Sequence, residues 1–370
     1  MSTVCDLNRC TGCMACIDRC NNNSITIVDS LKYYNAVINE ESCRRCSACY
    51  RVCPVINLPE LQNPIAWKQG WSCDSKIREE ASSGGVATSI ACEFIKREGI
   101  VCGCIFEKGN FHFDIIEYEQ DVRKLFGSKY VKSNPEGIYK KVKRYLTEGK
   151  KVLFIGLPCQ VAAVKNYIKD DLMNKLYTID LICHGTPSPQ ILKFYLREMN
   201  YDITEVKDIV FRQNHSFQLQ VDLNKIATNG MPDLYSMSFL NGISYTENCY
   251  ECRYAQIERT GDLTLGDSWG TFLSDEEQNK GISLILCQTD KGKELMDIGR
   301  LHLEDVDLDR AISANHQLSK PTERPPRYNL FFQGLNKGKT VSYMTMRCYP
   351  KMMLKRKFAE LKAQLNKMTD

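Results

Sequence analysis

The chain has 370 residues, 43% of them hydrophobic and 25% charged, and a formal net charge of +4. These proportions are ordinary for a globular protein, and the length allows two domains, one small and one large. No run of about 18 apolar residues occurs, so we expect no transmembrane segment. The first residues, MSTVCDLNRC, lack the basic and apolar regions of a secretory signal. We therefore expect a cytoplasmic protein whose thiols stay reduced.

Nineteen cysteines in such a compartment predict metal binding rather than disulfides, since nine of them fall within the first 53 residues. Residues 10–20 read CTGCMACIDRC, and residues 43–54 read CRRCSACYRVCP. Both motifs have the spacing Cys-x2-Cys-x2-Cys-x3-Cys, and each cysteine of the first recurs 33 positions later. In two-cluster ferredoxins the fourth cysteine of each motif binds the cluster held by the other motif.

The repeat therefore predicts two 4Fe-4S clusters; zinc is disfavoured because zinc sites use two separated pairs of ligands. Pro54 follows the second motif as in bacterial ferredoxins, whereas Asn21 takes that place after the first. Cys5 lies outside the pattern and is not expected to be a ligand. The expected ligand sets are Cys10, Cys13, Cys16 and Cys53 for one cluster, and Cys43, Cys46, Cys49 and Cys20 for the other.

Between the motifs, SITIVDS and YYNAVIN predict a short β-hairpin. The proline-bearing stretch LPELQNP indicates a linker, so we expect a dicluster ferredoxin-like domain over residues 1–62. A larger domain over residues 63–335 and a basic amphipathic helix over residues 336–370 are expected to follow. The expected fold class is α/β (α+β), with a mostly parallel or mixed sheet flanked by helices in the larger domain.

A Gly-rich turn in ASSGGVATSIACEFIKREG leads into an expected helix, which the strand IVCGCIFE follows. Amide groups at the start of a helix favour anions, so this turn is a candidate phosphate site. A tight packing turn is the alternative, because an exposed helix terminus contributes only about 0.3–1 kcal/mol. The candidate residues are Ser82, Ser83, Gly84 and Gly85.

Two later segments, KKVLFIGLPCQVAAVKNYI and LYTIDLICHGTPSPQILKFYL, each indicate a strand, a loop with a cysteine and a helix. Such units build a parallel sheet whose ligands gather at the carboxyl ends of the strands, so Cys159 and Cys183 should share one edge. Cys249 and Cys252 of CYEC precede another expected strand, DLTLGD. Together the four cysteines predict a third 4Fe-4S cluster; buried core cysteines and an unrelated pair are the alternative.

The motifs SSGGVAT, FGSKYVKS, GLPCQVAAV, ICHGTPS, CYEC and GDSWG, in this order, resemble the family of beta subunits of coenzyme F420 hydrogenases and dehydrogenases. The resemblance covers roughly residues 65–335 and implies an iron–sulfur flavoprotein that binds FAD. It also implies electron exchange between clusters and a hydride-accepting organic molecule. The third set of four cysteines is consistent with the family pattern.

The resemblance further implies which residues form the flavin site. The ammonium of Lys129 would stabilise an anionic reduced flavin, and a surface ion pair is the alternative. His184 is the candidate proton donor, with a histidine satisfied by backbone hydrogen bonds as the alternative. The residues implied to lie against or near FAD are Ser83, Gly84, Gly85, Ser128, Lys129, Tyr130, Gly266 and Asp267, and the candidate substrate contacts are His316, Arg324 and Arg327.

The expected function is that of an oxidoreductase passing electrons between ferredoxin, or another redox protein, and a small-molecule hydride acceptor. One alternative is a non-catalytic electron-transfer subunit of a larger redox complex, and another is a structural or regulatory cluster protein. The identity of the acceptor and the direction of electron flow stay open.

The segment from Lys337 onward has a local charge of +7, which leaves the preceding 336 residues at −3. We interpret it as a solvated basic face and expect no nucleic-acid partner. Helical spacing of its apolar residues predicts packing on the globular part or on a second copy of the chain, with a membrane surface or an acidic ferredoxin as the alternative. The apolar residues are Leu354, Phe358, Leu361, Leu365 and Met368.

Overall fold

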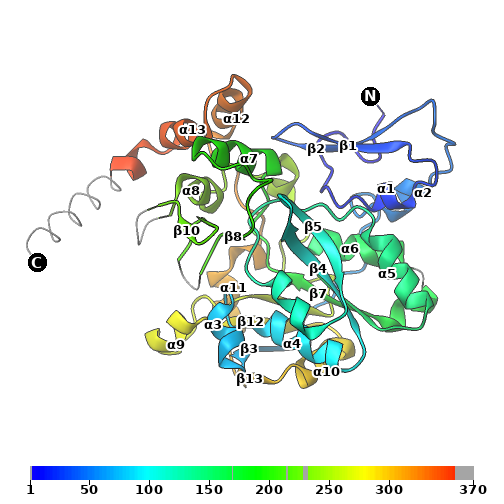
Figure 1. Ribbon diagram of the computed structural model, residues 1–370. Helices are drawn as coiled ribbons and strands as arrows, with labels where there is room; N and C mark the ends of the chain where they lie inside the picture. The colour runs from blue at the N-terminus through cyan, green and yellow to red at the C-terminus, as the bar shows by residue number, and fades with distance from the viewer. Residues whose placement is uncertain (1, 169, 214–215, 228–231, 355–370) are drawn as a thin grey trace, which may run out of the picture.

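The fold consists of a large sheet-and-helix domain and a small N-terminal hairpin domain (Figure 1). The structure, a computed structural model, describes residues 2–168, 170–213, 216–227 and 232–354. The expected α/β class is confirmed, because a mixed eight-stranded sheet carries helices on both faces. Within the described ranges no helix has the length and apolar character needed to cross a membrane.

The central sheet has a parallel middle and antiparallel edges. Its strands are β3 Ala66–Ser72, β4 Ile100–Glu107, β5 Asn110–Ile116, β6 Val152–Gly156, β7 Leu176–Leu181, β11 Leu263–Asp267, β12 Ser283–Cys287 and β13 Leu301–Glu304. They are ordered β13-β3-β12-β11-β7-β6-β4-β5, and the four strands β11, β7, β6 and β4 run parallel. The parallel register places Val152 opposite Leu176 and Ile179 opposite Leu263.

Strand β6 shows why both faces of the sheet are covered. Val152 and Phe154 pack with helices on one face and Leu153 with helices on the other, because side chains alternate along a strand. The helices are α5 Ile138–Thr147 and α6 Pro158–Tyr167 on the first face, and α4 Val86–Lys96 and α10 Asp290–Ile298 on the second. Shorter elements are α3 Ser75–Glu80, η1 Glu119–Leu125, η2 Asp170–Lys175, α9 Asp275–Lys280, α11 Leu308–Ala314 and η4 His316–Leu318.

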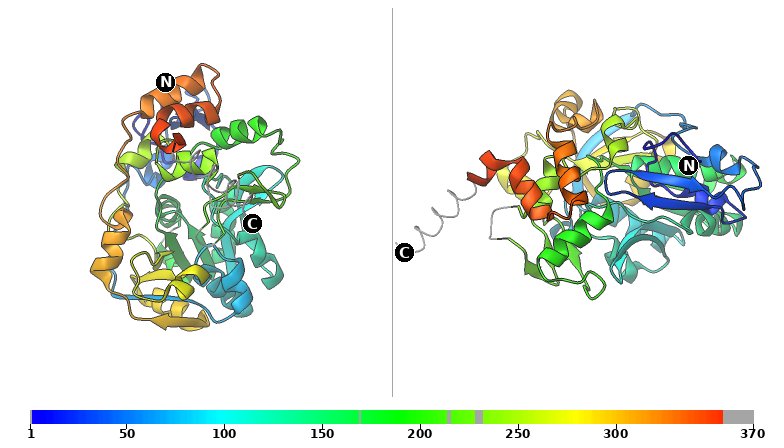
Figure 2. Two further views of the ribbon diagram at one scale, coloured as in Figure 1. Left: turned by 90° about the vertical axis from the view of Figure 1, so that its left-hand side faces the viewer. Right: turned by 90° about the horizontal axis from the view of Figure 1, so that it is seen from above.

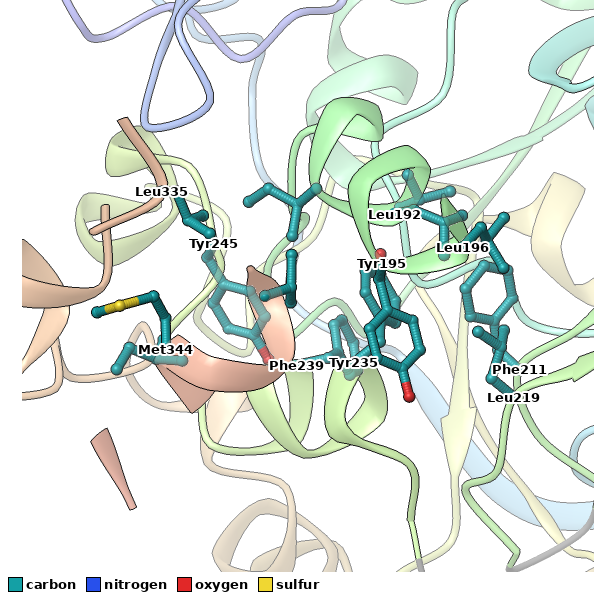
Figure 3. Close-up of a cluster of buried hydrophobic side chains, with 14 of the residues drawn as sticks. Leu192, Tyr195, Leu196, Phe211, Leu219, Tyr235, Phe239, Tyr245, Leu335 and Met344 are labelled. Carbon is teal, nitrogen blue, oxygen red and sulfur yellow. The ribbon is translucent and has the colours of Figure 1, made fainter. Parts of the chain in front are cut away.

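A separate aromatic core joins the remaining elements of the large domain (Figure 3). These elements are α7 Pro189–Glu198, β8 Ile209–Val210, β9 Gln220–Val221, α8 Leu234–Leu240, η3 Glu247–Glu251, α12 Tyr328–Asn336 and α13 Val341–Cys348, whereas the exposed strand β10 Asn224–Lys225 only pairs with β9. Leu192 of α7, Tyr235 of α8 and Met344 of α13 all pack in this core. Tyr245 and Tyr250 belong to it as well, so the core also holds the segment that carries CYEC.

The segment expected to form one C-terminal helix is interrupted in the structure at Tyr349, which is not helical: a second helical stretch covers residues 350–354, and the stretch before the break is α13. Thr340 precedes this helix, and its hydroxyl accepts a hydrogen bond from the N–H of Tyr343. The helix packs against α7 and α8. Of the expected apolar stripe, Leu354 alone lies within the described residues, where it is exposed, and the other four lie outside them: Phe358, Leu361, Leu365 and Met368.

The N-terminal domain contains the expected hairpin and displays the 33-residue repeat as structure. Its elements are α1 Ala15–Arg19, β1 Ile25–Asp29, β2 Tyr34–Ile38 and α2 Ala48–Val52, with β1 antiparallel to β2. The two helices occupy equivalent positions in the two motifs, and each ends at the fourth cysteine of its motif. Each follows a left-handed residue, Met14 at φ 58° and Ser47 at φ 57°.

The small domain docks on the large domain through α1. Asp18 is 2% exposed, and its carboxylate accepts hydrogen bonds from the N–H groups of Gly137 (2.6 Å) and Tyr139 (3.0 Å) at the start of α5. These N–H groups have no partner within their own helix, so an acidic side chain there stabilises the contact. The hairpin β1–β2 lies beside α12 (Figure 2), where Lys32 donates a hydrogen bond to Asn329.

Candidate functional site

The carboxyl ends of three parallel strands meet at one edge of the sheet. Cys183 follows β7, and Gly266 and Asp267 end β11 beside it. Cys159 follows β6, but it lies in the first turn of α6 rather than in the expected loop. The reason is Pro158, which suits the first position of a helix and starts α6 directly after the strand. The strand pattern therefore predicted the shared edge correctly.

One cavity at this edge is lined by all four cysteines of the expected third cluster. They are Cys159, Cys183, Cys249 and Cys252, here called the edge set. The last two reach the cavity from η3 and the residue after it. Thr11 and Arg9 of the N-terminal domain line the same cavity. The edge set thus lies where the two domains meet.

The chemistry of the edge set fits a metal cluster. Burial raises the pKa of Cys159 well above its usual value, raises that of Cys183 to about 12, and raises that of Cys252. Such thiols ionise when a cation compensates their charge, and coordination to a metal deprotonates them. No group of three described His, Cys, Asp or Glu side chains could hold a single metal ion. A cubane cluster binds each thiolate at a different corner, so its ligands surround a volume instead.

A smaller cavity inside the N-terminal domain is lined by one of the two sets that the repeat predicts. This middle set is Cys10, Cys13, Cys16 and Cys53. Burial raises the pKa of Cys13 to about 12. Cys5, which is outside the motif, lines the same cavity beside Cys10 and Cys53. The neighbouring Cys5 thiol lowers the pKa of Cys10 and lowers that of Cys53 to about 7.

The remaining N-terminal cysteines are the most accessible of the three sets. This surface set is Cys20, Cys43, Cys46 and Cys49. Cys46 is exposed, and Cys49 lies within electrostatic reach of Cys20 and Cys43. The side chains of Arg44, Arg45 and Arg51 are exposed around it.

The surface-set and middle-set loops share one backbone geometry. Gly12 and Arg45, each two residues after the first cysteine of its motif, have φ of 73° and 53°. Their N–H groups donate to the sulfurs of Cys10 and Cys43, at 3.4 Å in both loops. Hydrogen bonds to a sulfur favour its charged form, as cluster-binding loops require.

The three sets follow one another from the surface to the sheet edge. Cys16 of the middle set lies within electrostatic reach of Cys49 of the surface set. Cys13 of the middle set lies within electrostatic reach of Cys159 of the edge set. The middle set therefore lies between the other two.

The residues implied to contact a flavin are connected to one another, although none of them lines the edge-set cavity. Ser82 accepts a hydrogen bond of 2.8 Å from the N–H of Ser128. The N–H of Gly84 donates to Ser283 at 3.0 Å, and Ser283 lies opposite Asp267 in the sheet. The structure thus brings the SSGG turn, the GSKY segment and the end of β11 together.

Close packing explains the glycines and serine of this region without reference to a ligand. A Cβ on Gly84 would lie 2.4 Å from the carbonyl oxygen of Gly70, and one on Gly266 would lie 2.5 Å from the side chain of Ile182. Gly85 precedes α4 at φ 76°, and the hydroxyl of Ser83 donates to a backbone carbonyl. The alternative of a tight packing turn therefore accounts for Ser83, Gly84 and Gly85 of the SSGG turn.

A buried ion pair at the end of β11 adds charge and aromatic surface to the region. Arg212 binds both carboxylate oxygens of Asp267, at 2.6 and 2.9 Å, and hydrogen bonds to Tyr130. Its guanidinium lies 4.7 Å from the ring centroid of Phe217 and 5.5 Å from that of Trp269. A buried guanidinium among aromatic rings fits a planar anionic group.

The ammonium of Lys129, a candidate catalytic group, is engaged by the backbone. It donates to the carbonyl oxygens of Leu125 (3.1 Å), Phe126 (2.8 Å) and Gly127 (3.2 Å) at the end of η1. Burial lowers the pKa of Lys129. The ammonium of this half-buried lysine therefore caps the end of η1 and does not form the surface ion pair named as the alternative.

His184 lies between the edge set and the Arg212–Asp267 pair. Its ring lines the cavity of the edge set, and both members of the ion pair act on it electrostatically. His184 is exposed, but desolvation by the surrounding cavity wall, with repulsion from His316, lowers its pKa to about 4, so the ring is neutral at pH 7. The amide nitrogen of Gln317 lies 2.6 Å from Nδ1 and donates to it, which leaves the hydrogen on Nε2.

The three candidate substrate contacts have partners within the fold. Arg324 forms an ion pair with Glu247. Arg327 donates to the carbonyl oxygen of Cys348 at 3.0 Å and so holds the end of α13. The ring of His316 hydrogen bonds to Gln317.

Motif reasoning missed three residues of the site: Arg212, Gln317 and Lys132. Arg212 and Gln317 belong to no recognisable spacing. Lys132 lies within FGSKYVKS, but nothing in that segment distinguishes it from other lysines. Each of these residues is positioned in the site by a hydrogen bond to a segment that is distant in the sequence.

The fold and the cysteine sets define an iron–sulfur protein of the oxidoreductase type. Residues 9–57 match the 4Fe-4S dicluster domain. Residues 68–136 match the N-terminal part of the coenzyme F420 hydrogenase/dehydrogenase beta subunit, and residues 149–308 match its C-terminal part. The chain therefore belongs to the family of coenzyme F420 hydrogenase/dehydrogenase beta subunits and carries a 4Fe-4S dicluster domain in front, which indicates electron transfer.

Individual relatives agree with this family. An uncharacterised protein of Methanocaldococcus jannaschii is 28% identical over 204 residues, which cover 45% of this chain and 55% of the relative. The chain thus spans about half the length of that relative. One of the subunits of the F420H2 dehydrogenase of Methanosarcina mazei is 23% identical over 245 residues, covering 60% of this chain and 69% of the relative.

A solved structure shares the fold. It is a chain in the xenon-derivatised F420-reducing NiFe hydrogenase complex from Methanosarcina barkeri, with a TM-score of 0.50 and 20% identity. The match covers 76% of this chain and 97% of that chain. At this identity the likeness supports the fold alone.

Proposed function

We propose that the chain is an iron–sulfur flavoprotein oxidoreductase, which passes electrons between a one-electron redox protein such as ferredoxin and a small organic molecule that exchanges hydride. The observation that carries this proposal is the line of three cysteine sets from the exposed surface to the sheet edge, beside the Arg212–Asp267 pair. Under the proposal the edge set holds a third 4Fe-4S cluster, and the region around Arg212 holds FAD. Bound FAD supplies the exchange between one-electron and two-electron chemistry.

The protein's own groups have distinct roles in this proposal. The guanidinium of Arg212 balances negative charge on a bound cofactor, and Asp267 holds it in place through two hydrogen bonds. Ser82 and Ser128 fix the turn before α4, where backbone N–H groups favour a phosphate. The Nε2–H of His184 is available as a hydrogen-bond donor in the cavity.

Buried tyrosines exclude water from the edge set. Tyr245 is 1% exposed and lies within electrostatic reach of Cys183 and Cys249. Tyr254 is 5% exposed and lies within electrostatic reach of Cys159 and Cys252. Solvent exclusion and nearby hydrogen-bonding groups both influence the reduction potential of a cluster.

The surface set is the proposed entry point for electrons. Exposed Arg44, Arg45 and Arg51 give its rim positive charge, and Tyr50 and Ile56 add exposed apolar area. This combination suits an acidic redox protein, which opposite charges would guide to the exposed cluster. One relative is named as a subunit of an F420H2 dehydrogenase, so coenzyme F420 is the first hydride acceptor to test.

The test is anaerobic stopped-flow spectroscopy of the purified chain mixed with reduced ferredoxin, followed by addition of coenzyme F420, a quinone or a pterin. The proposal predicts that the iron–sulfur absorbance falls rapidly as the clusters are reduced and that the flavin absorbance falls next. At least one acceptor should then reoxidise both the flavin and the clusters. A chain that releases no flavin on denaturation, yet passes electrons between two one-electron carriers, would be a non-catalytic electron-transfer subunit and would contradict the proposal.

A further inference from the structure

Lys132 is a buried cation between the middle set and the edge set. It is 5% exposed, and its Nζ donates a hydrogen bond of 2.9 Å to the carbonyl oxygen of Thr11. Thr11 lies between Cys10 and Cys13 in the middle-set loop. The backbone N–H of Lys132 donates to Pro187 at 2.9 Å, in the segment that follows Cys183. Lys132 therefore bridges the two segments that carry these sets.

The ammonium of Lys132 acts electrostatically on thiols of both sets. It favours the charged forms of Cys10 in the middle set and of Cys159 and Cys183 in the edge set. The ring of Tyr34 lies 5.2 Å from the nitrogen and adds a cation–π contact. Neither a backbone carbonyl nor a ring carries a full negative charge that could balance the ammonium.

Of the arginines that line the edge-set cavity, Arg253 is exposed and donates to the carbonyl oxygen of Val55, whereas the remaining two have carboxylate partners. Arg259 pairs with Asp180 at 2.8 Å, and both side chains are buried. Arg9 pairs with Glu251. Lys132 has no carboxylate within ion-pair distance among the residues that the structure describes. A buried charge requires compensation, and thiolates of the two sets are the anionic groups within reach of Lys132.

Gly12 provides independent evidence that the fold accommodates this lysine. The equivalent residue of the surface-set loop is Arg45, whose side chain is exposed. A Cβ on Gly12 would lie 2.9 Å from Cδ of Lys132 and 3.1 Å from the ring of Tyr34. The two loops have the same backbone geometry, so the glycine is needed where the lysine stem passes and not where the loop faces solvent.

We propose that Lys132 is the counter-charge shared by the middle and edge sets, and that it raises the reduction potentials of the clusters they hold while leaving the surface cluster unaffected. This inference rests on the proposed function, because it requires clusters at these sets. Reduction transfers one electron from the external redox protein to a cluster and adds one negative charge to it. A fixed cation nearby favours the reduced state, and more strongly in a buried site than in water.

The experiment is a redox titration of the anaerobically purified full chain, followed by electron paramagnetic resonance, for wild type, K132Q and K132R. At a fixed potential we expect K132Q to increase the ratio of oxidised to reduced middle and edge clusters about tenfold. For a one-electron couple this corresponds to midpoint potentials that are lower by about 59 mV than in wild type. The surface cluster should not shift, and K132R should stay near wild type because it keeps the charge. K141Q, which removes an exposed lysine on α5, is the matched control.

Unchanged potentials in K132Q at full iron content would overturn the proposal, as would an equal shift of all three clusters or an equal shift in K132R. An edge cluster missing from the wild type would instead contradict the proposed function, and the middle cluster would still test Lys132. If K132Q loses iron, G12A supplies the test, because its methyl group would displace the lysine stem. A lower potential of the middle cluster supports the proposal, and an unchanged one contradicts it.

Discussion

The hydroxyl of Tyr139 donates a hydrogen bond of 2.6 Å to the carbonyl oxygen of Cys13. Tyr139 belongs to α5 of the large domain and is fully buried, whereas Cys13 belongs to the middle set of the small domain. The thiol of Cys13 lies within electrostatic reach of Cys159 in the edge set. The contact that docks the domains therefore also fixes the position of the middle set relative to the edge set.

Replacing Tyr139 by Phe should destabilise this docking. The change leaves the buried carbonyl of Cys13 without its partner, and a hydrogen bond of this kind contributes about 0.5–1.5 kcal/mol. Anaerobic denaturant unfolding of the loaded protein measures the loss. Tyr118 is 66% exposed, so Y118F is the control and should change the free energy of unfolding by less than about 0.5 kcal/mol. Equal effects of the two changes would mean that the docking contact contributes nothing.

Replacing Cys249 and Cys252 by Ser should remove the edge cluster and leave the two N-terminal clusters in place. Both residues line the edge-set cavity and neither lines the middle-set cavity. Iron analysis should therefore fall by about four atoms per chain. Cys73 is exposed and belongs to none of the three sets, so C73S should leave the iron content unchanged. An iron content unaffected by the double change would rule out the edge cluster.

Replacing Asp267 by Asn should weaken flavin binding and destabilise the fold. The guanidinium of Arg212 would lose a charged partner in a buried site, which costs about 1.5–3 kcal/mol. The guanidinium would keep its charge but would no longer be held in position for the proposed cofactor by two charge-assisted hydrogen bonds. Fluorescence of the flavin released per chain, together with thermal unfolding, checks both effects. D305N removes an exposed carboxylate paired with Lys68 and should change neither quantity. Full flavin content in D267N would argue against a flavin beside this pair.

Reversing the charges of Arg44, Arg45 and Arg51 should slow electron entry from an acidic ferredoxin. These side chains are exposed beside the surface set, and steering by opposite charges acts mainly on the association rate. The apparent KM for ferredoxin should rise several-fold at low salt and approach that of wild type at high salt, while reduction by dithionite stays unchanged. Reversal of Lys280 and Lys293, exposed on α9 and α10, is the control. Equal slowing by the control would place the docking surface elsewhere.

Local spacing predicted much of the site. The middle and surface sets follow from a 33-residue repeat, because their loops are short and each cysteine holds its place through its own motif. Predicting the edge set required one further inference, namely that Cys159 and Cys183 follow neighbouring parallel strands. The position of Cys159 within a helix could also have been expected, since Pro158 is suited to a helix start.

Contacts between distant segments could not be predicted in the same way. Gly84 is held by Ser283, which lies 199 residues later, and Lys132 reaches Thr11 across 121 residues. Arg212 pairs with Asp267 across 55 residues. These pairings depend on how the two domains dock and on the order of the strands in the sheet. Neither the docking nor the strand order can be predicted from the periodicity of the sequence.

Counting iron and FAD in the anaerobically purified chain tests the central claim most directly. The claim is that three clusters connect an exposed entry point with a flavin. It predicts about twelve iron atoms and one FAD per chain, with the iron held as three cubane clusters. A chain with about eight iron atoms and no flavin would contradict it, because only the dicluster domain would then carry electrons.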